Sequence, residues 1–113
     1  IDMGVNVACS SDAPVVPPHW QTIWSAAVTR SFRDDPQHTD AQRITAEEAI
    51  TSMSANAAWQ SREETWRGRI APGLAADLII LNDTVDWEDP WSWRELKPET
   101  VLIDGRPVHG SLG

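Results

Sequence analysis

The sequence lacks the features that mark membrane, nucleic-acid-binding and disulfide-rich proteins. It has no run of about 18 apolar residues, the length that a bilayer span requires, and no basic segment followed by an apolar stretch at its start. Its nine Lys and Arg residues form no cluster that could neutralise phosphates, and 17 Asp and Glu residues bring the formal net charge to −8. We therefore expect no membrane partner, no nucleic-acid partner and a cytoplasmic location.

Cysteine is almost absent, because Cys9 is the single one in the sequence, and this excludes an intramolecular disulfide. Cys9 lies in the apolar run over residues 5–9, where a free cysteine is more often a small buried hydrophobe than a reactive thiol. The 113 residues and 41% apolar content suit one small domain with a core. Since the chain opens with Ile1 and not with methionine, we expect it to be a piece of a longer protein.

The first half of the sequence predicts a strand and two helices. Residues 4–9 are short and β-branched, as in a buried strand, and turn formers at 10–14 end it. Apolar residues recur at helical spacing over 20–28, which predicts a helix that packs on a sheet. Residues 33–42 show no periodicity and indicate a loop. Thr45 and Glu48 then form a capping box that starts a second helix. Its apolar stripe contains Ala46, Ala49, Ile50, Met53 and Ala57.

The second half predicts strands. Residues 78–81, Leu-Ile-Ile-Leu, are typical of a strand covered on both faces. Near the end, residues 100–103 and 106–109 flank Asp104 and Gly105, a pair that predicts a hairpin turn. Pro107 has no N–H group to donate, so we expect the second hairpin strand to lie at an edge of its sheet.

Four segments in this order resemble the C-terminus of amidohydrolases. They are residues 11–14 (Ser-Asp-Ala-Pro), 27–30 (Ala-Val-Thr-Arg), 43–49 (Arg-Ile-Thr-Ala-Glu-Glu-Ala) and 68–81, which runs from Gly-Arg-Ile-Ala-Pro-Gly to Ala-Asp-Leu-Ile-Ile-Leu. The likeness is greatest to the amidohydrolase 3 branch, the relatives of N-acyl-amino-acid and N-substituted formamide deacylases. Residues 101–108 match the closing hairpin of that branch, so the resemblance covers nearly the whole chain.

The resemblance implies an α/β fold, namely the C-terminal part of a (β/α)8 barrel together with part of a small β-sandwich. Residues 1–61 would contain the eighth barrel strand and the helices after it. Residues 62–113 would belong to the β-sandwich. Leu74 and Ser54 depart from the residues that relatives often carry at these positions, and neither position belongs to the metal chemistry.

The resemblance also implies a role for Asp12, which matches the carboxylate that the family places at the end of the eighth strand, on the catalytic face of such barrels. Asp12 would contact a divalent metal, expected to be zinc, and transfer a proton from water to the departing amine. Without the resemblance, an Asp after a strand is more often a turn or capping residue. Ser11 and His19 would lie near the substrate, although a solvated loop histidine is the simpler interpretation of His19.

The other metal ligands of the family are a His-x-His pair, a carboxylated Lys or Glu and two later His residues, and this sequence contains none of them. Its own histidines, His19, His38 and His109, have neither His-x-His nor i, i+4 spacing. We therefore expect no cofactor in this chain alone, and no activity of this chain without the rest of the enzyme.

The seven tryptophans fall into two groups. Trp20, Trp24, Trp59 and Trp66 lie on or beside apolar faces and are expected in the core. Trp87, Trp91 and Trp93 lie in an acidic insertion at residues 83–93, which could cover the rest of the enzyme or a second subunit.

Two functions follow from the sequence. The first is a metal-dependent hydrolase of non-peptide C–N bonds in small-molecule amides, to which this chain contributes Asp12. The second is a non-enzymatic α/β module that acts in protein–protein interaction or oligomerisation. In both, we expect association with the remainder of the same polypeptide or with another copy, because a lone parallel strand has unpaired edges.

Overall fold

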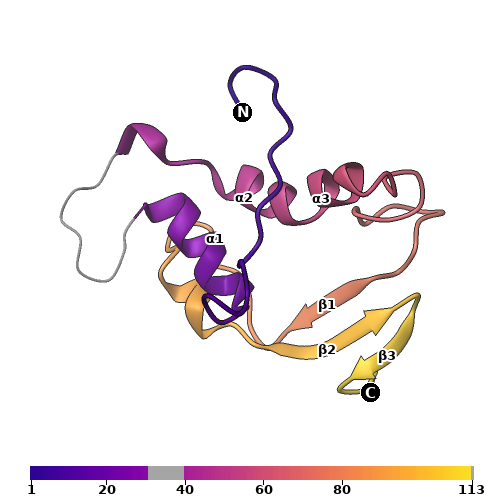
Figure 1. Ribbon diagram of the computed structural model, residues 1–113. Coiled ribbons are helices and arrows are strands. Elements are labelled where there is room, and N and C mark those ends of the chain that lie inside the picture. The colour runs from indigo at the N-terminus through magenta and orange to yellow at the C-terminus, as the bar shows by residue number, and fades with distance from the viewer. Residues whose placement is uncertain (31–39, 113) are drawn as a thin grey trace.

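The computed structural model describes residues 1–30 and 40–112 as an α/β arrangement of short helices and one three-stranded sheet (Figure 1). The helices lie on one side of the molecule and the sheet on the other. The elements in chain order are α1 (Trp20–Thr29), η1 (Asp40–Gln42), α2 (Ala46–Met53), α3 (Ala55–Gln60), β1 (Leu78–Leu81), η2 (Ser92–Glu95), β2 (Pro98–Ile103) and β3 (Arg106–His109). The loop predicted over 33–42 lies outside the described residues as far as position 39, and the 3-10 helix η1 forms its end.

Both predicted helices are present, and α2 begins where the sequence indicated. The Glu48 N–H donates to Thr45 Oγ1 at 3.2 Å, and the Thr45 N–H donates to Glu48 Oε2 at 2.7 Å. This capping box satisfies two N–H groups that the helix itself leaves without acceptors. The helix is interrupted at Ser54, whose hydroxyl donates to the Ile50 carbonyl at 2.8 Å, and α3 continues beyond it. The predicted apolar stripe is therefore divided between two helices.

The sheet is antiparallel with strand order β1-β2-β3, so the prediction of an edge position for the last strand is confirmed. Asp104 and Gly105 join β2 to β3 with φ angles of +50° and +73°. Two successive positive φ values are the requirement of the tight hairpin turns whose twist matches that of the strands. The turn is held from outside as well, because Asp77 Oδ1 accepts from the Asp104 N–H at 2.9 Å and the Ala76 carbonyl accepts from the Gly105 N–H at 3.0 Å.

Two strand predictions were wrong in part. Residues 4–9 form an extended segment and not a strand, with Val5 61% exposed, because none of the three strands of the described structure runs beside it. An extended segment becomes a strand only when a neighbour satisfies its N–H and C=O groups. β1 exists as predicted but is an edge strand, and Ile79 and Ile80 are 51% and 40% exposed. It is therefore not covered on both faces.

The buried core is small and lies between the helices and the sheet. Its buried hydrophobic residues are Ala49, Ala58, Trp93, Leu96 and Leu102. Among the buried polar side chains, Thr29 Oγ1 donates to the Ser25 carbonyl and Ser52 Oγ donates to the Ala49 carbonyl, both at 2.7 Å, whereas Ser25 Oγ accepts from Arg94 Nε at 3.1 Å. The Cα radius of gyration is 15.1 Å, whereas a compact domain of 100 residues has a radius of about 13 Å. The described structure thus leaves much apolar surface uncovered.

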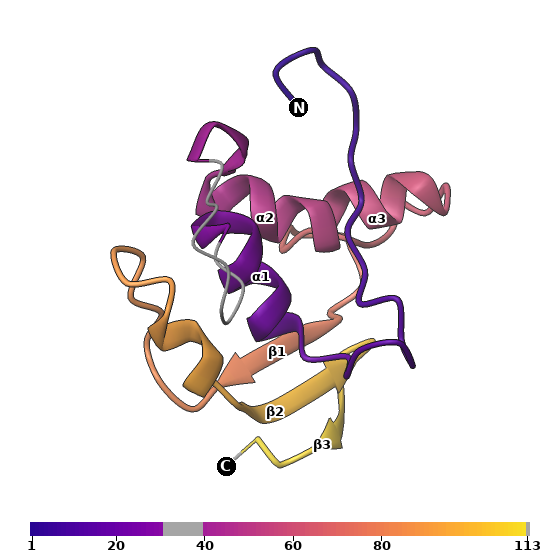
Figure 2. The same ribbon diagram turned by 60° about the vertical axis from the view of Figure 1, so that its left-hand side comes forward.

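The tryptophans meet the two expectations only in part, and Trp87 and Trp91 of the insertion are 58% and 47% exposed. Trp20 and Trp24 are half-buried, whereas Trp59 and Trp66, expected in the core, are 52% and 46% exposed. Trp93, expected to cover another surface, is the largest fully buried side chain and packs within the chain. The reason is that residues 83–96 fold back on α1, so the insertion supplies its own core residue (Figure 2).

Candidate functional site

Asp12 lies in a turn that precedes α1, with an exposed side chain and a left-handed φ of +55°. Its carbonyl accepts from the Val15 N–H at 3.0 Å, and its own N–H donates to Ser10 Oγ at 3.4 Å. An Asp tolerates the left-handed region better than most residues with a side chain. The carboxylate is therefore presented at a backbone turn and is accessible to solvent.

The two serines before Asp12 shape that turn. Ser10 Oγ accepts from the Asp12 N–H, and Ser11 Oγ accepts from the Ala13 N–H at 3.3 Å. Hydroxyls that bond a backbone N–H two residues on are typical turn formers. Ser11 is half-buried and lies next to Asp12, as a substrate-proximal residue requires, but its hydroxyl has this structural partner.

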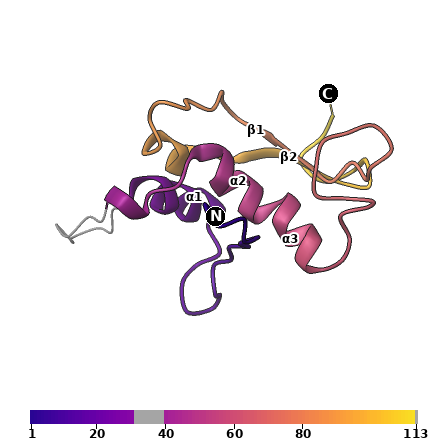
Figure 3. The ribbon, with the colours of Figure 1, turned by 90° about the horizontal axis from the view of Figure 1, so that it is seen from above.

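His19 is the N-cap residue of α1, and its ring is exposed and makes no capping hydrogen bond. The backbone N–H and the backbone carbonyl of His19 are both hydrogen-bonded. Its N–H donates to the Pro17 carbonyl at 2.8 Å, and its carbonyl accepts from the N–H groups of Thr22 and Ile23 at 3.1 and 3.2 Å. Asp12 and His19 are thus the two ends of one loop. Figure 3 shows the N-terminal segment, in indigo, leading into α1.

Asp12 fits a metal ion as one ligand, because an exposed carboxylate is a common oxygen donor to zinc. In residues 1–30 and 40–112, however, no three His, Cys, Asp or Glu side chains come together as a metal site. His38 lies outside the described residues. A zinc site needs at least three protein ligands, and the described residues bring no such set together.

Long-range hydrogen bonds hold both ends of the segment that carries Asp12. Upstream, the Cys9 N–H donates to the Ser52 carbonyl at 3.1 Å and Asn56 Nδ2 donates to the Val7 carbonyl at 3.0 Å. Downstream, Gln21 Nε2 donates to the Leu96 carbonyl at 2.7 Å. The sequence analysis missed Asn56 and Gln21, because their partners are 49 and 75 residues away and no local pattern marks such pairs.

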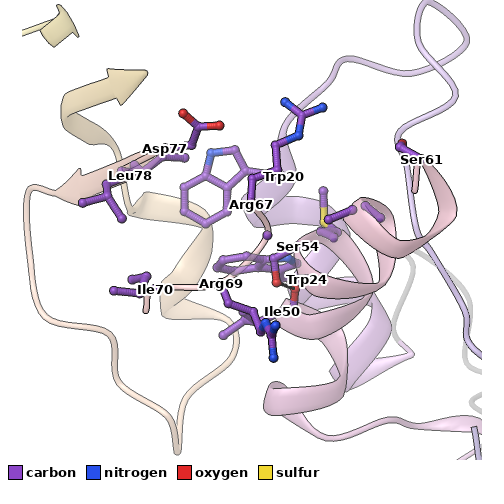
Figure 4. A pocket seen from close by; sticks show the side chains of 15 residues that line it. Trp20, Trp24, Ile50, Ser54, Ser61, Arg67, Arg69, Ile70, Asp77 and Leu78 are labelled. Carbon is purple, nitrogen blue, oxygen red and sulfur yellow. Dashed lines mark hydrogen bonds between the residues drawn. The ribbon is translucent and has the colours of Figure 1, made fainter. Parts of the chain in front are cut away.

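A cleft of about 660 Å³ separates the helices from β1. Figure 4 shows Trp20 and Trp24 in it, between the helix that carries Ile50 and the strand that carries Leu78. The two indole rings meet edge to face with centroids 4.5 Å apart. The Trp24 indole N–H is buried and has no acceptor among the described residues. The cleft is mainly apolar and lies between the two halves of the chain.

The chain matches one family profile and is similar to several known proteins. The profile of the amidohydrolase family matches residues 1–109. The chain is 31% identical to the N-substituted formamide deformylase of Arthrobacter pascens over 93% of its length. It is 29% identical over 96% of its length to YtcJ of Bacillus subtilis strain 168, whose name assigns it to the amidohydrolases. It is also 27% identical over 89% of its length to the urease alpha subunit of Natronomonas pharaonis.

The chain is much shorter than these relatives. It spans 19% of the deformylase, 21% of YtcJ and 16% of the urease subunit. No solved structure matches it significantly. Within residues 1–30 and 40–112, no helix has both the length and the apolar character that crossing a membrane requires.

Proposed function

Because the chain belongs to the amidohydrolase family, we propose that it is the C-terminal part of a metal-dependent enzyme that hydrolyses C–N bonds in small-molecule amides. The observation that carries this proposal is the match of the family profile to nearly the whole chain. The name of the deformylase relative favours an N-substituted formamide as the substrate class.

In the proposed enzyme, Asp12 is the catalytic carboxylate and one of the metal ligands. The metal, when bound, supplies Lewis acidity that makes water easier to deprotonate near neutral pH. Asp12 accepts the proton from the attacking water and passes it to the nitrogen that leaves as an amine. Its exposure at a turn suits this exchange, because the carboxylate meets solvent and substrate without a change of fold.

We assign residues 1–61 to the end of a (β/α)8 barrel and residues 62–113 to a small β-sandwich. The extended segment over 4–9 would pair as the eighth strand when its barrel neighbours are present. Support comes from its extended backbone, which pairs with no strand of the described residues, and from its exposed valines, Val5 and Val7, which a neighbouring strand would cover.

The remainder of the same polypeptide is the partner that best accounts for the uncovered apolar surface. In the described residues, 16 large hydrophobic residues are exposed and five hydrophobic residues are buried. Large apolar side chains that gather on a protein surface often mark a contact with another segment or a partner. The rest of the polypeptide would then fill the cleft beside Trp24 and provide an acceptor for the Trp24 indole N–H.

Metal removal tests this function. Dialysis of the full-length protein against a chelator is expected to abolish release of the amine from an N-substituted formamide, and added zinc is expected to restore it. The measurement is amine release beside metal content by mass spectrometry. Hydrolysis that continues in metal-free protein would contradict the proposed mechanism.

A further inference from the structure

We propose that residues 83–96, here named the clamp segment, position the first turn of α1 and with it the loop between Asp12 and His19. The inference rests on the proposed hydrolase function for its catalytic consequence. Its structural part concerns contacts within this chain alone.

The first contact joins the clamp segment to the start of α1. Gln21 Nε2 donates to the Leu96 carbonyl at 2.7 Å, and Leu96 is buried with 6% exposure. Gln21 lies in the first turn of α1, two residues after His19. A partly buried carbonyl that loses its donor is costly, so this hydrogen bond fixes the helix start relative to η2.

The second contact lies one helical turn further along α1. Arg94 Nε donates to Ser25 Oγ at 3.1 Å, and Ser25 is fully buried. The Arg94 guanidinium also lies 4.4 Å from the centre of the Trp91 ring, which holds it from the other side. Between these two contacts, Trp93 is buried where η2 packs on α1. The helix is therefore held at two points on the same face.

The clamp segment is stabilised by hydrogen bonds of its own. An element that positions another must be rigid itself. At its base, the Lys97 N–H donates to Asn82 Oδ1 at 2.6 Å and the Asn82 N–H donates to the Lys97 carbonyl at 3.0 Å. Carboxylates of Asp83, Asp86 and Asp89 each accept a backbone N–H one or two residues on, at 2.7 to 3.1 Å. A loop of this size with joined ends and internal hydrogen bonds is a compact unit.

The loop from Asp12 to His19 has few contacts of its own. Two backbone hydrogen bonds form within it, from the Val15 N–H to the Asp12 carbonyl and from the His19 N–H to the Pro17 carbonyl. A loop with so few internal restraints takes its position from its anchors, and the start of α1 is the downstream one. Gln21 is therefore a positioning residue for the proposed reaction, and a small displacement there reduces turnover.

The test compares Gln21→Met with Gln60→Met in the full-length protein. Both remove an amide side chain, but Gln60 is exposed at the end of α3, and its side chain forms no hydrogen bond with the described residues. Gln21→Met is expected to lower kcat about tenfold with KM nearly unchanged. It should also speed hydrogen exchange of the peptide over residues 12–23, measured by mass spectrometry. Gln60→Met is expected to change neither.

A second variant distinguishes a loss of positioning from simple misfolding of the Gln21→Met protein. Asn82→Ala opens the base of the clamp segment without touching α1, and it is expected to give the same faster exchange and the same loss of kcat. Unchanged exchange in both variants would overturn the proposal, and so would faster exchange with unchanged kcat. If the wild-type protein hydrolyses no amide, the proposed function fails, and the exchange measurement alone then decides whether the clamp segment holds the loop.

Discussion

Asp12→Asn in the full-length protein is expected to lower kcat for amide hydrolysis by about a thousandfold, within the range that a positioned acid–base group contributes. The amide keeps the size of the carboxylate and can form the same turn, because the turn uses the backbone N–H and carbonyl of this residue. What the amide cannot do is accept a proton from water. The loss should therefore appear in kcat and not in stability.

Asp2→Asn is the matched control for this substitution. Asp2 is exposed in the same N-terminal segment, and it precedes the extended residues that lead to Asp12. The same change of charge at that position is expected to leave turnover within about twofold, because a surface charge far from the chemistry contributes little. Steady-state kinetics measures kcat for both variants. Near-normal turnover by Asp12→Asn would show that Asp12 is not the catalytic carboxylate.

Trp93→Ala is expected to reduce the free energy of unfolding by about 3–5 kcal/mol, the range for deleting a buried large aromatic side chain. Trp93 is 1% exposed, its ring meets Trp87 edge to face at 5.9 Å, and its indole N–H donates to the Asp86 carbonyl. The substitution leaves a cavity under α1 and an unpaired carbonyl. In a core with so few fully buried hydrophobic residues, this loss is large.

Trp59→Ala provides the comparison, because Trp59 is 52% exposed at the end of α3. Its replacement is expected to cost about 1 kcal/mol or less. Urea unfolding followed by far-ultraviolet circular dichroism measures both variants without relying on tryptophan fluorescence. Equal losses from the two substitutions would show that Trp93 is not the centre of the core.

The sequence predicted those elements whose signals are local. The Thr45 and Glu48 capping box lies within four residues, and the Asp104 and Gly105 turn needs only its own two φ angles. For the same reason the helical spacing over 20–28 led directly to α1. Each of these signals is satisfied within one turn or one hairpin, so distant residues cannot override it.

The incorrect expectations all depended on distant partners. Residues 4–9 have the composition of a strand, but pairing requires a neighbouring strand that none of the described residues provides. Trp93 was expected to cover the rest of the enzyme or a second subunit because it lies in an acidic insertion, yet the carboxylates of Asp86 and Asp89 accept backbone N–H groups in turns of a segment that packs on α1. The composition of a loop does not show which neighbouring element the loop packs against.

The same difference between local signals and distant partners applies to the candidate site. The turn at Asp12 could be predicted from its serines and from the family resemblance, and its catalytic role stays a prediction. The hydrogen bond between Gln21 and the Leu96 carbonyl could not be predicted, because 75 residues separate the two partners. Positioning residues of this kind become visible only when the fold brings their elements together.

The most direct test of the central claim is amide hydrolysis by the 113-residue chain and by the full-length protein, assayed side by side with added zinc. A barrel of this kind needs about 250 residues, and the described part of this chain brings no three metal-ligating side chains together. We expect turnover by the full-length protein and none by the chain alone. Turnover by the chain alone, or its absence in zinc-loaded full-length protein with N-substituted formamides and N-acyl amino acids, would contradict this expectation.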